Sequence, residues 1–562
     1  MCNLVDDKWL PVQPFEGVLD RVSLRTGLLE AEKFSNLVFP APTLLPAVLR
    51  QVLLPVVIDA IGSPRSSSEW RSWFDRGCFS DAQRERLEEY LDEHARSFDL
   101  FSEKRPFAQV GGLKTEKGET KSSSLLVSSI ASGNNVPLFS GMTEADTLAL
   151  EPAEAAWWLL HTHCWDTAAI KSGAEGDPQA AKGKTTGNPT GPLGQLGVII
   201  PLGRTLYETL LLNLPPRDHS PDSFDRPQWR ADEVDTVAGS TPVSSPASPR
   251  WSLRPELGLM DLLTWQSRRI RLIPEETPDG LRVTQVVLCA GDRLSRAPQN
   301  EPHTAWSWTS KPRKGQQQWR PRRHRPGRAI WQGLESLLAV NLPADPEEGG
   351  SPETEVTSDL LRALGELRID GALPDDYPMQ IVAAGMVYGN QSAVVESAIA
   401  DRLPLPLAAL ASGEFTQDLV RDLARQANTL ATALNRLHSD LRRLAGGDPV
   451  PWDKGDHPGT VFLHALDPLV RRALRGIQEH SEDDEALEAG MTAWEGRLWQ
   501  IAEQHAQRLL SAAPASPFSG VEVDNRRYSA TTAERAFRSK LYSALPKQAE
   551  VLRTRSQTQQ GG

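Results

Sequence analysis

Cysteine is scarce in this chain, which has only four in 562 residues. Cys2, Cys78, Cys164 and Cys289 are widely scattered, and no two have the close spacing of a structural zinc site or a small disulfide framework. We therefore expect free, buried thiols and no structural zinc. No run of about 18 apolar residues is evident, and the N-terminus lacks the basic and then apolar pattern of a signal peptide. These absences predict a cytoplasmic protein without a membrane anchor.

Positive charge is also in deficit, because 61 basic residues face 73 acidic ones and give a net charge of -12. Sequence-independent DNA affinity comes mainly from many Lys and Arg contacts to phosphate, so this balance excludes a protein that coats nucleic acid over its whole surface. Any nucleic-acid contact must be local or assisted by partners. One segment departs from the average, since Lys311 to Arg328 carries eight basic residues and no acidic one, with Trp308, Trp319 and Trp331 interleaved. This mixture of basic and aromatic residues favours contact with nucleic acid, although a solvated surface loop can have the same composition.

Neither common phosphate-binding fingerprint is present: the sequence has no GxxxxGKS or GxxxxGKT and no GxGxxG. A nucleotide-hydrolysing site is therefore not expected. A glycine-rich segment does run from Lys171 to Gly194, and it contains Lys182 and Lys184 on either side of Gly183. Glycines let backbone amides approach a phosphate or a base edge, and the lysines supply charge. We interpret this segment as a loop that could contact nucleic acid.

The apolar patterning divides the chain into two regions. Residues 1–390 mix helical and strand signals and are interrupted by long polar loops, of which Leu113 to Ala145, Pro215 to Pro249 and Asn341 to Asp359 are the clearest. Residues 391–562 read almost wholly as helix. The predicted fold class is α+β: an irregular mixed N-terminal domain followed by a C-terminal four-helix bundle.

The bundle prediction rests on helical spacing of apolar residues. The first expected helix carries a seam at steps of four and three and ends at Gly446 and Gly447. Its seam residues are Leu423, Ala427, Leu430, Leu434, Leu437, Leu441 and Leu444. Three more helices are expected at Phe462 to Ile477, Leu487 to Ile501 and Thr531 to Leu545, and the helical pattern is expected to begin at Ser392.

A short polar joint, Gly385 to Ala393, is expected between the two regions. A Gly-Asn-Gln turn there could project the Gln391 amide from a rigid base. An uncharged side chain with both donor and acceptor groups can enter a minor groove, or replace the hydrogen bonds of a broken base pair. This makes Gln391 a candidate wedge. The alternative interpretation is that Asn390 is simply a helix N-cap and Gln391 the first helical residue.

A possible metal cluster, His161-Thr162-His163-Cys164, is the basis of a competing function. A metal-dependent nuclease or hydrolase could use His161 and His163 together with Asp166. Both histidines lie on what looks like one apolar helix, however, where positions i and i+2 point to different faces. We therefore favour a structural role and expect no metal.

Three segments resemble a known family. Asn3 to Val12 (NLVDDKWLPV), Phe98 to Gln109 (FDLFSEKRPFAQ) and Gly389 to Ala393 (GNQSA) are similar to motifs of CasA, the large subunit of the type I-E CRISPR surveillance complex Cascade. The resemblance implies a non-enzymatic subunit without cofactor or membrane. Such a subunit would recognise the protospacer-adjacent motif (PAM) in double-stranded DNA, start strand separation and R-loop formation, and help to recruit a helicase-nuclease. Its partners would be the other Cascade subunits, CRISPR RNA and the target DNA.

The family's DNA-contacting positions can be carried over to this sequence. The resemblance implies that one loop, a glycine loop and the turn before the bundle approach the motif. The matching residues are Asn134, Asn135 and Phe139 for the first loop, Lys182, Gly183 and Lys184 for the second, and Asn390 and Gln391 for the turn. Some relatives have a cysteine cluster after the segment matching Trp265 and Gln266, and only Cys289 remains here. A third reading is a scaffold that makes no DNA contact.

Overall fold

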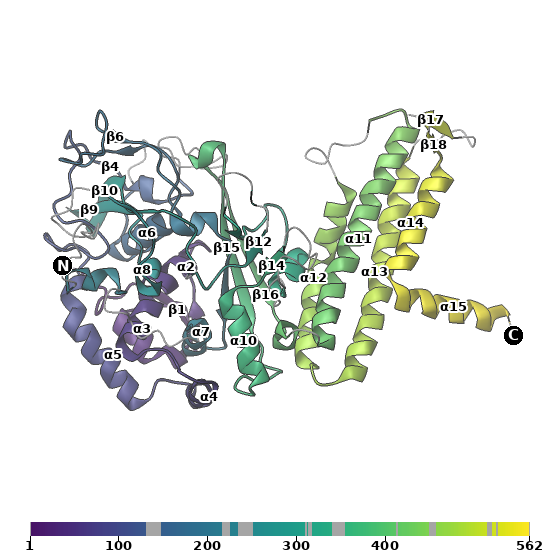
Figure 1. Cartoon of the computed structure of the whole chain (residues 1–562), viewed down its shortest axis with the longest axis horizontal. Coiled ribbons are helices and arrows are strands. Elements are labelled where there is room, and N and C mark those ends of the chain that lie inside the picture. The colour runs from purple at the N-terminus through teal and green to yellow at the C-terminus, as the bar shows by residue number, and fades with distance from the viewer. Residues whose placement is uncertain are drawn as a thin grey trace. The chain divides into compact units, whose positions relative to one another are not determined.

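The computed structural model describes residues 2–130, 148–215, 225–233, 251–299, 301–309, 312, 317–339, 354–411, 414–448, 457–513, 520–523 and 526–560. The chain divides into two compact units (Figure 1). Unit 1 comprises Met1–Gly327, Asn341–Leu373 and Met379–Arg402, and unit 2 comprises Arg328–Val340, Pro374–Pro378 and Leu403–Gly562. The expected boundary at 390/391 therefore falls inside the last segment of unit 1.

Unit 1 opens with a small antiparallel sheet of order β2-β1-β3, in which β1 and β2 form the hairpin that the short apolar runs at Trp9 to Val12 and Gly17 to Leu24 predict. Its strands are β1 (Leu10–Pro14), β2 (Asp20–Val22) and β3 (Phe34–Leu37). The helices that follow or interrupt it are α1 (Leu24–Leu29), α2 (Leu44–Val48), the π-helical η2 (Leu49–Leu53), α3 (Leu54–Ile61), α4 (Ser67–Arg76) and α5 (Asp81–His94). Trp9 is fully buried beside this sheet and donates its indole N–H to the Leu4 carbonyl at 2.8 Å.

One helical run in the described residues, Leu44–Ile61, is long and apolar enough by composition to cross a membrane. The sequence itself indicates an apolar helix over these residues, although Arg50, Gln51 and Asp59 interrupt the apolar run. Its window is 83% buried inside the fold. Arg50 is itself buried and pairs with Glu301 at 2.6 Å. We therefore interpret this run as a core helix of unit 1.

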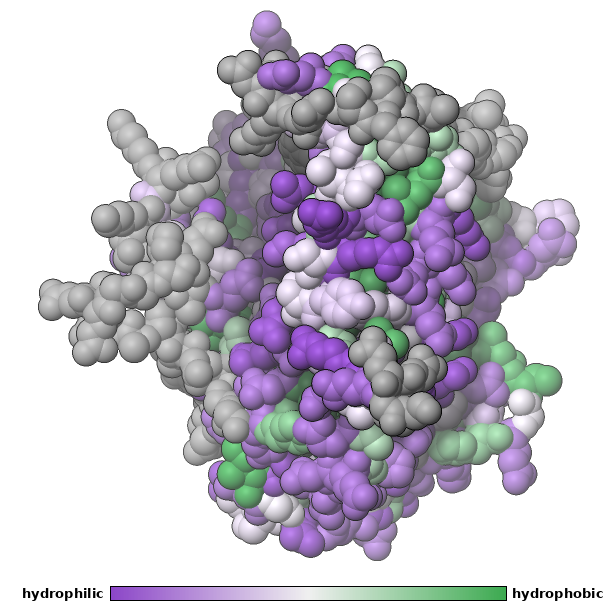
Figure 2. Space-filling view, turned by 90° about the vertical axis from the view of Figure 1, so that its right-hand side faces the viewer, coloured by the Kyte–Doolittle hydropathy of each residue, from purple (hydrophilic) through white to green (hydrophobic). Residues whose placement is uncertain are grey.

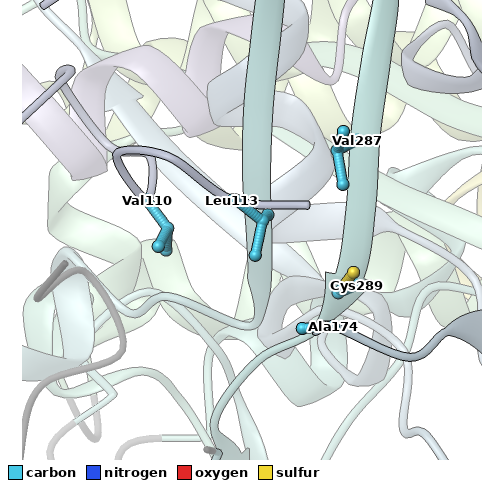
Figure 3. Packing of buried hydrophobic residues seen from close by; sticks show 5 residues of the cluster. All are labelled: Val110, Leu113, Ala174, Val287 and Cys289. Atoms are coloured by element: carbon cyan, nitrogen blue, oxygen red, sulfur yellow. The ribbon is translucent and has the colours of Figure 1, made fainter. Parts of the chain in front are cut away.

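The largest sheet among the described residues of unit 1 has five strands in the order β4-β10-β5-β6, in which β9 also pairs with β10. The bounds are β4 (Lys121–Ser122), β5 (Lys171–Ser172), β6 (Lys184–Thr185), β9 (Arg268–Thr277) and β10 (Gly280–Ala290). Val287 and Cys289, two positions apart on β10, point to one face of the sheet. There they form a buried cluster with Val110, Leu113 and Ala174 (Figure 3). All four cysteines are free, as expected.

The remaining elements of unit 1 connect these layers. They are η1 (Ala31–Lys33), η3 (Ala95–Phe98), η4 (Ser123–Leu126), α6 (Pro152–Trp165), η5 (Pro192–Gln195), β7 (Val198–Leu202), α7 (Leu206–Asn213), η6 (Gln228–Glu233), β8 (Leu253–Arg254), α8 (Leu259–Leu263), β11 (Arg293–Leu294), β12 (Trp306–Trp308), β13 (Trp319–Pro321), β14 (Thr354–Val356) and α10 (Asp359–Ile369). The apolar patterns of Pro152 to Asp166, Ile270 to Ile273 and Val283 to Leu288 predict one helix and two strands, and the structure has them in α6, β9 and β10.

The segment expected to be a polar joint is instead part of a sheet. β15 (Gln380–Tyr388) pairs antiparallel with β7, and β16 (Val395–Pro404) lies on its other side. A short 3₁₀ turn, η9 (Asn390–Ser392), joins β15 to β16. The expectation of helix from Ser392 onward is therefore wrong. Pairing with β15 places Glu396, Ala398 and Ala400, which are good helix formers, in an edge strand, so tertiary structure overrides local propensity here.

Unit 2 confirms the four-helix bundle and hence the α+β fold class. Its main helices are α11 (Phe415–Leu444), α12 (Pro458–Glu479), α13 (Asp484–Ala512) and α14 (Ala530–Ala544). A further helix as long as α14, α15 (Pro546–Gln560), follows it and was not expected. The smaller elements are η7 (Ile330–Gly333), α9 (Leu334–Leu337), η10 (Leu407–Leu410), β17 (Val521–Val523) and β18 (Arg526–Tyr528).

The expected seam of α11 is buried along its whole length, and Gly446 follows the helix with a φ of 77°. The interior of the bundle also contains a buried polar network. Glu495 accepts a hydrogen bond from the Gln426 side-chain amide at 2.8 Å, and the oxygen of that amide accepts one from the Trp494 indole N–H at 2.8 Å. On the face drawn in Figure 2, the described side chains are mostly hydrophilic, and hydrophobic ones occur only in small groups. The bundle therefore depends on its interior contacts.

Candidate nucleic-acid interface

The turn between β15 and β16 has an unusual backbone. Gln391 has φ 51° and ψ 26°, and Ser392 has φ 56°, so two successive residues other than glycine adopt the left-handed conformation. Each such residue costs on the order of 1 kcal/mol, which the surroundings must offset. Asn390 and Gln391 are both exposed. The turn therefore holds the Gln391 amide in solvent on a backbone that an unsupported peptide would rarely adopt.

Main-chain hydrogen bonds close this turn. The Gly389 N–H donates to the Val394 carbonyl at 2.9 Å, and the Ser392 N–H donates to the Gly389 carbonyl at 2.8 Å. A Cβ at Gly389 would lie 2.5 Å from Glu396 Oε1, so a larger residue there would require the Glu396 side chain to move. No N-cap hydrogen bond is formed at this turn and no α-helix follows it, so the interpretation of Asn390 as a helix N-cap is wrong.

Hydrogen bonds with residues at and just after the end of α6 fix the position of the turn. The Ala168 N–H donates to the Ser392 carbonyl at 2.8 Å. One step back on β15, the Tyr388 hydroxyl donates to the Trp165 carbonyl at 2.6 Å. Both contacts join residues more than two hundred positions apart in the sequence, so the turn is positioned by tertiary structure. This gives the rigid base that the sequence predicted for Gln391, although it is a sheet and a helix end and not a joint between domains.

A buried ion network lies at the same helix end. Asp166 follows α6 and pairs with Lys171 Nζ at 2.6 Å and with the Arg268 guanidinium. Arg268 also donates to the carbonyls of Thr167, at 2.9 Å, and Pro189, at 2.8 Å. We call Asp166, Lys171 and Arg268 the anchor. It connects α6, β5 and β9 and braces the loop that contains Ala168.

Charge balance within the anchor depends on its carboxylate. Burial would raise the pKa of Asp166, but the two cations overcome this and hold it at about 2. Burial lowers the pKa of Lys171 to about 8 despite the attraction of Asp166. Asp166 is therefore ionised throughout the neutral range and compensates two buried cations. Sequence reasoning missed this role, although the charged pair at the start of the apolar β9 sequence was a signal of buried ion pairs.

The glycine-rich segment is mostly loop, as expected, and contains a tight hairpin turn. Ala181 and Lys184 exchange both main-chain hydrogen bonds, at 2.8 and 3.1 Å, around Lys182 and Gly183. These two residues have φ of 52° and 72°, as a two-residue type I′ turn requires. Lys182 and Lys184 are exposed on opposite sides of the turn. The predicted residues therefore present two cations at a tight hairpin turn that leads directly into β6, the strand that pairs with β5.

The anchor also connects this hairpin to the Gln391 turn. Lys171, which pairs with Asp166, is the β5 residue that lies opposite Thr185 of β6. Ala168, three residues earlier, holds the Ser392 carbonyl. The structure thus ties two of the three predicted contact regions to one buried group. Asn134, Asn135 and Phe139, the third region, lie outside the described residues.

The two histidines of the competing hypothesis are core residues. His161 Nε2 lies 3.0 Å from Thr43 Oγ1, and His163 Nε2 donates to the Ala108 carbonyl at 2.9 Å. Burial lowers the pKa of His161 to about 3 and that of His163 to about 4. Among the described residues, no three His, Cys, Asp or Glu side chains are grouped as a metal ion would require. The geometry therefore gives no support to a metal-dependent hydrolase at this helix.

Comparison with known proteins supports the family resemblance. The model of the CRISPR-associated protein Cse1 family matches residues 3–505. A CasA/Cse1 protein of Thermus thermophilus is 31% identical over 283 residues, so the match spans half of this chain and half the length of that relative.

Solved structures agree over almost the whole chain. Cse1 of Thermobifida fusca is 30% identical with a TM-score of 0.77, covering 97% of this chain and 98% of that one. Cse1 of Acidimicrobium ferrooxidans is 28% identical with the same TM-score and coverage. A chain of a CRISPR RNA-guided surveillance complex shares the fold at 19% identity and a TM-score of 0.64, covering 90% of this chain and 99% of that one. The chain described here belongs to the CRISPR-associated protein Cse1 family.

Proposed function

We propose that this chain is the non-catalytic large subunit of a type I-E Cascade complex. In this role it recognises the PAM in double-stranded DNA, initiates strand separation and R-loop formation, and helps to recruit the helicase-nuclease. The main support for this proposal is the Gln391 turn. It exposes an uncharged amide on a left-handed backbone, and hydrogen bonds from Ala168 and Tyr388 hold the turn in place. The cytoplasmic location stays a prediction, consistent with four free cysteines.

The chemistry of the turn suits a wedge. The amide of Gln391 has two donors and an acceptor and carries no charge, so it can meet base edges without a counter-ion. The Lys182 and Lys184 ammonium groups, on the hairpin that shares the same anchor, can neutralise backbone phosphates. An approach from the minor groove gives degenerate readout, so tolerance of several motif sequences follows.

The energy of opening must come from several sources. Unpairing one or two base pairs costs a few kcal/mol. Pairing of the target strand with CRISPR RNA offsets this cost, because the hybrid is about as stable as the duplex that it replaces. An acidic chain can take part because the other Cascade subunits would supply most of the phosphate-binding surface. The contribution of this chain is to start opening at a fixed point.

The test replaces Gln391 in the assembled complex. Gln391→Ala should weaken binding to a duplex that carries the motif while leaving binding to single-stranded target unchanged. Gln391→Gly separates the amide from the backbone, because glycine adopts the left-handed conformation at no steric cost. It should be defective in the same way. Gln557→Ala, at an exposed glutamine of α15, is the matched control and should behave as wild type.

Two outcomes would contradict the proposal. Equal losses on duplex and single-stranded target would remove the wedge role of Gln391. A complex that binds motif and non-motif duplexes equally well, with or without this chain, would favour a scaffold that makes no DNA contact.

A further inference from the structure

Unit 2 contains an apolar groove that the proposed DNA contacts do not use. The groove has a volume of about 410 Å³ and lies among α11, α12 and α13, which pack against one another. Its larger apolar side chains come from all three helices and are Leu423 of α11, Leu469 and Ile477 of α12, and Leu487, Met491 and Trp494 of α13. We call this feature the bundle groove.

The polar side chains that line the bundle groove are Arg472, Arg497 and His480, and no Asp or Glu is among its described lining residues. Both arginines are exposed. Among the described residues, Arg472 forms no ion pair, and Arg497 donates only to the neutral side chain of Gln500, at 2.9 Å. Arg471, the neighbour of Arg472, pairs by contrast with Asp467. In a chain with a net charge of -12, two uncompensated cations beside an apolar groove favour an anionic ligand.

The two arginines lie toward the same end of the bundle groove. The short 480–483 connection joins α12 to α13, so these helices run antiparallel. Arg472 is one turn before Gly476 on α12, and Arg497 is one turn after Ala493 on α13, so both lie away from the connection. The connection itself carries acidic residues, which would repel an anion. An anionic head group is therefore favoured at the arginine end, with an apolar tail directed toward the connection.

We propose that the bundle groove binds a long-chain carboxylate, with its head group beside Arg472 and Arg497 and its alkyl chain along the apolar side chains. A guanidinium can donate two parallel hydrogen bonds to one carboxylate. The volume lies in the range of roughly 300 to 1,000 Å³ that holds small ligands, whose sites are mostly apolar with a few polar groups. The unbranched side chain of Met491 can adapt to an alkyl chain.

An acidic amphipathic helix of a partner protein is the other occupant that this chemistry could hold. Such a helix carries its charges along a whole face. The arginines that line the bundle groove are instead confined to one end of it, which favours a ligand with a single anionic head. The inference does not rest on the proposed function, because the bundle groove lies wholly in unit 2 and its test uses no DNA.

The test is a calorimetric titration of the full-length chain with dodecanoate below its micelle-forming concentration. Dodecanoate should bind at one site. Decanoate, which is shorter by two CH₂ groups, should bind about tenfold more weakly. Butanoate keeps the head group but lacks the tail, and dodecyltrimethylammonium keeps the tail but reverses the charge. Neither should bind measurably.

Variants of the lining test the position of the head group and of the tail. Arg472→Gln and Arg497→Gln should each weaken dodecanoate binding about fivefold, equivalent to ~1 kcal/mol for an exposed charged pair. Arg475→Gln, at an exposed arginine of α12 that does not line the groove, is the matched control and should bind as wild type.

Gly490→Leu should abolish binding by filling the bundle groove. A Cβ at Gly490 would meet no other element within 4 Å, and leucine is a better helix former than glycine. The melting temperature of this variant should therefore be no lower than that of wild type. Ala489→Leu, at the preceding exposed position of α13, does not alter the lining and should bind dodecanoate normally.

Four results would overturn the inference. The first is no dodecanoate binding by wild type, and the second is equal binding of dodecyltrimethylammonium, which would indicate unspecific uptake of amphiphiles. The third is an equal loss with Arg475→Gln, and the fourth is normal binding by Gly490→Leu. If dodecanoate did not bind and Gly490→Leu prevented assembly with partner proteins, the bundle groove would be a protein contact instead.

Discussion

The anchor makes an asymmetric prediction, because one carboxylate compensates two buried cations. Asp166→Asn would leave Lys171 and Arg268, whose side chains are 6% and 1% exposed, without a counter-charge. Removing one partner of a buried ion pair costs about 3–5 kcal/mol. Lys171→Met would instead leave Asp166 paired with Arg268 and would fill the space with an apolar side chain. Burial already lowers the pKa of Lys171 to about 8, so its charge is costly to keep there. We expect this variant to cost less than about 1 kcal/mol.

The effect should be local to the base of the Gln391 turn. The Ala168 N–H, two residues from Asp166, is bonded to the Ser392 carbonyl at 2.8 Å, so its hydrogen exchange reports on the turn itself. A decrease of ~3 kcal/mol in the local free energy of opening accelerates hydrogen exchange about a hundredfold. Exchange at Ala168 should rise by that factor in Asp166→Asn and by less than about fivefold in Lys171→Met. The Leu430 amide, inside α11 of the other unit, is the internal control and should not change.

If Lys171→Met accelerated exchange at Ala168 as much as Asp166→Asn does, the dominant role of the Asp166 carboxylate would be refuted. In that case the lysine, and not the carboxylate, would dominate the network. Unchanged exchange in Asp166→Asn would show that the turn does not depend on the anchor. A double variant, Asp166→Asn with Lys171→Met, should be less damaged than Asp166→Asn alone, because it leaves one uncompensated cation and not two.

Two further predictions concern charge. Lys182→Gln and Lys184→Gln should each lower the affinity of the assembled complex for duplex DNA and reduce the magnitude of the slope of log affinity against log salt by about 0.9. Lys117→Gln, at an exposed lysine outside the hairpin, is the control and should change neither. An unchanged slope would remove both hairpin lysines from the phosphate contacts. The folded-state pKa of Asp166 is about 2, below its ordinary value of 3.8, so its contribution of ~2 kcal/mol is complete above about pH 4 and is lost as the pH falls towards 2. The urea midpoint of wild type should therefore fall more steeply over that range than that of Asp166→Asn, and parallel curves would contradict the assignment.

The bundle could be predicted from sequence because its information is local. The α11 seam repeats at steps of three and four, and the glycine that ends it follows directly. The turn at Lys182 and Gly183 and the exposure of Gln391 could also be predicted from sequence, because turn residues have their own conformational preferences. The anchor was not, since Asp166 and Arg268 are 102 residues apart and only the folded chain brings them together. The same limit explains the error at β16, whose strand conformation depends on pairing with β15.

The left-handed backbone at Gln391 has a consequence for how a wedge would act. A flexible glutamine would lose backbone and side-chain freedom on entering a duplex, at a cost of about 1–2 kcal/mol for the backbone alone. Here that cost is met during folding, because Ala168 and the turn's own hydrogen bonds already fix residues 389 to 394. Binding energy from the DNA can then be used to separate bases. By this argument a substitution that loosens the support, such as Asp166→Asn, should impair opening of a motif-bearing duplex even though the amide itself is intact. Its defect should disappear on a motif-bearing duplex with a mismatched bubble next to the motif, where no base pair remains to be broken.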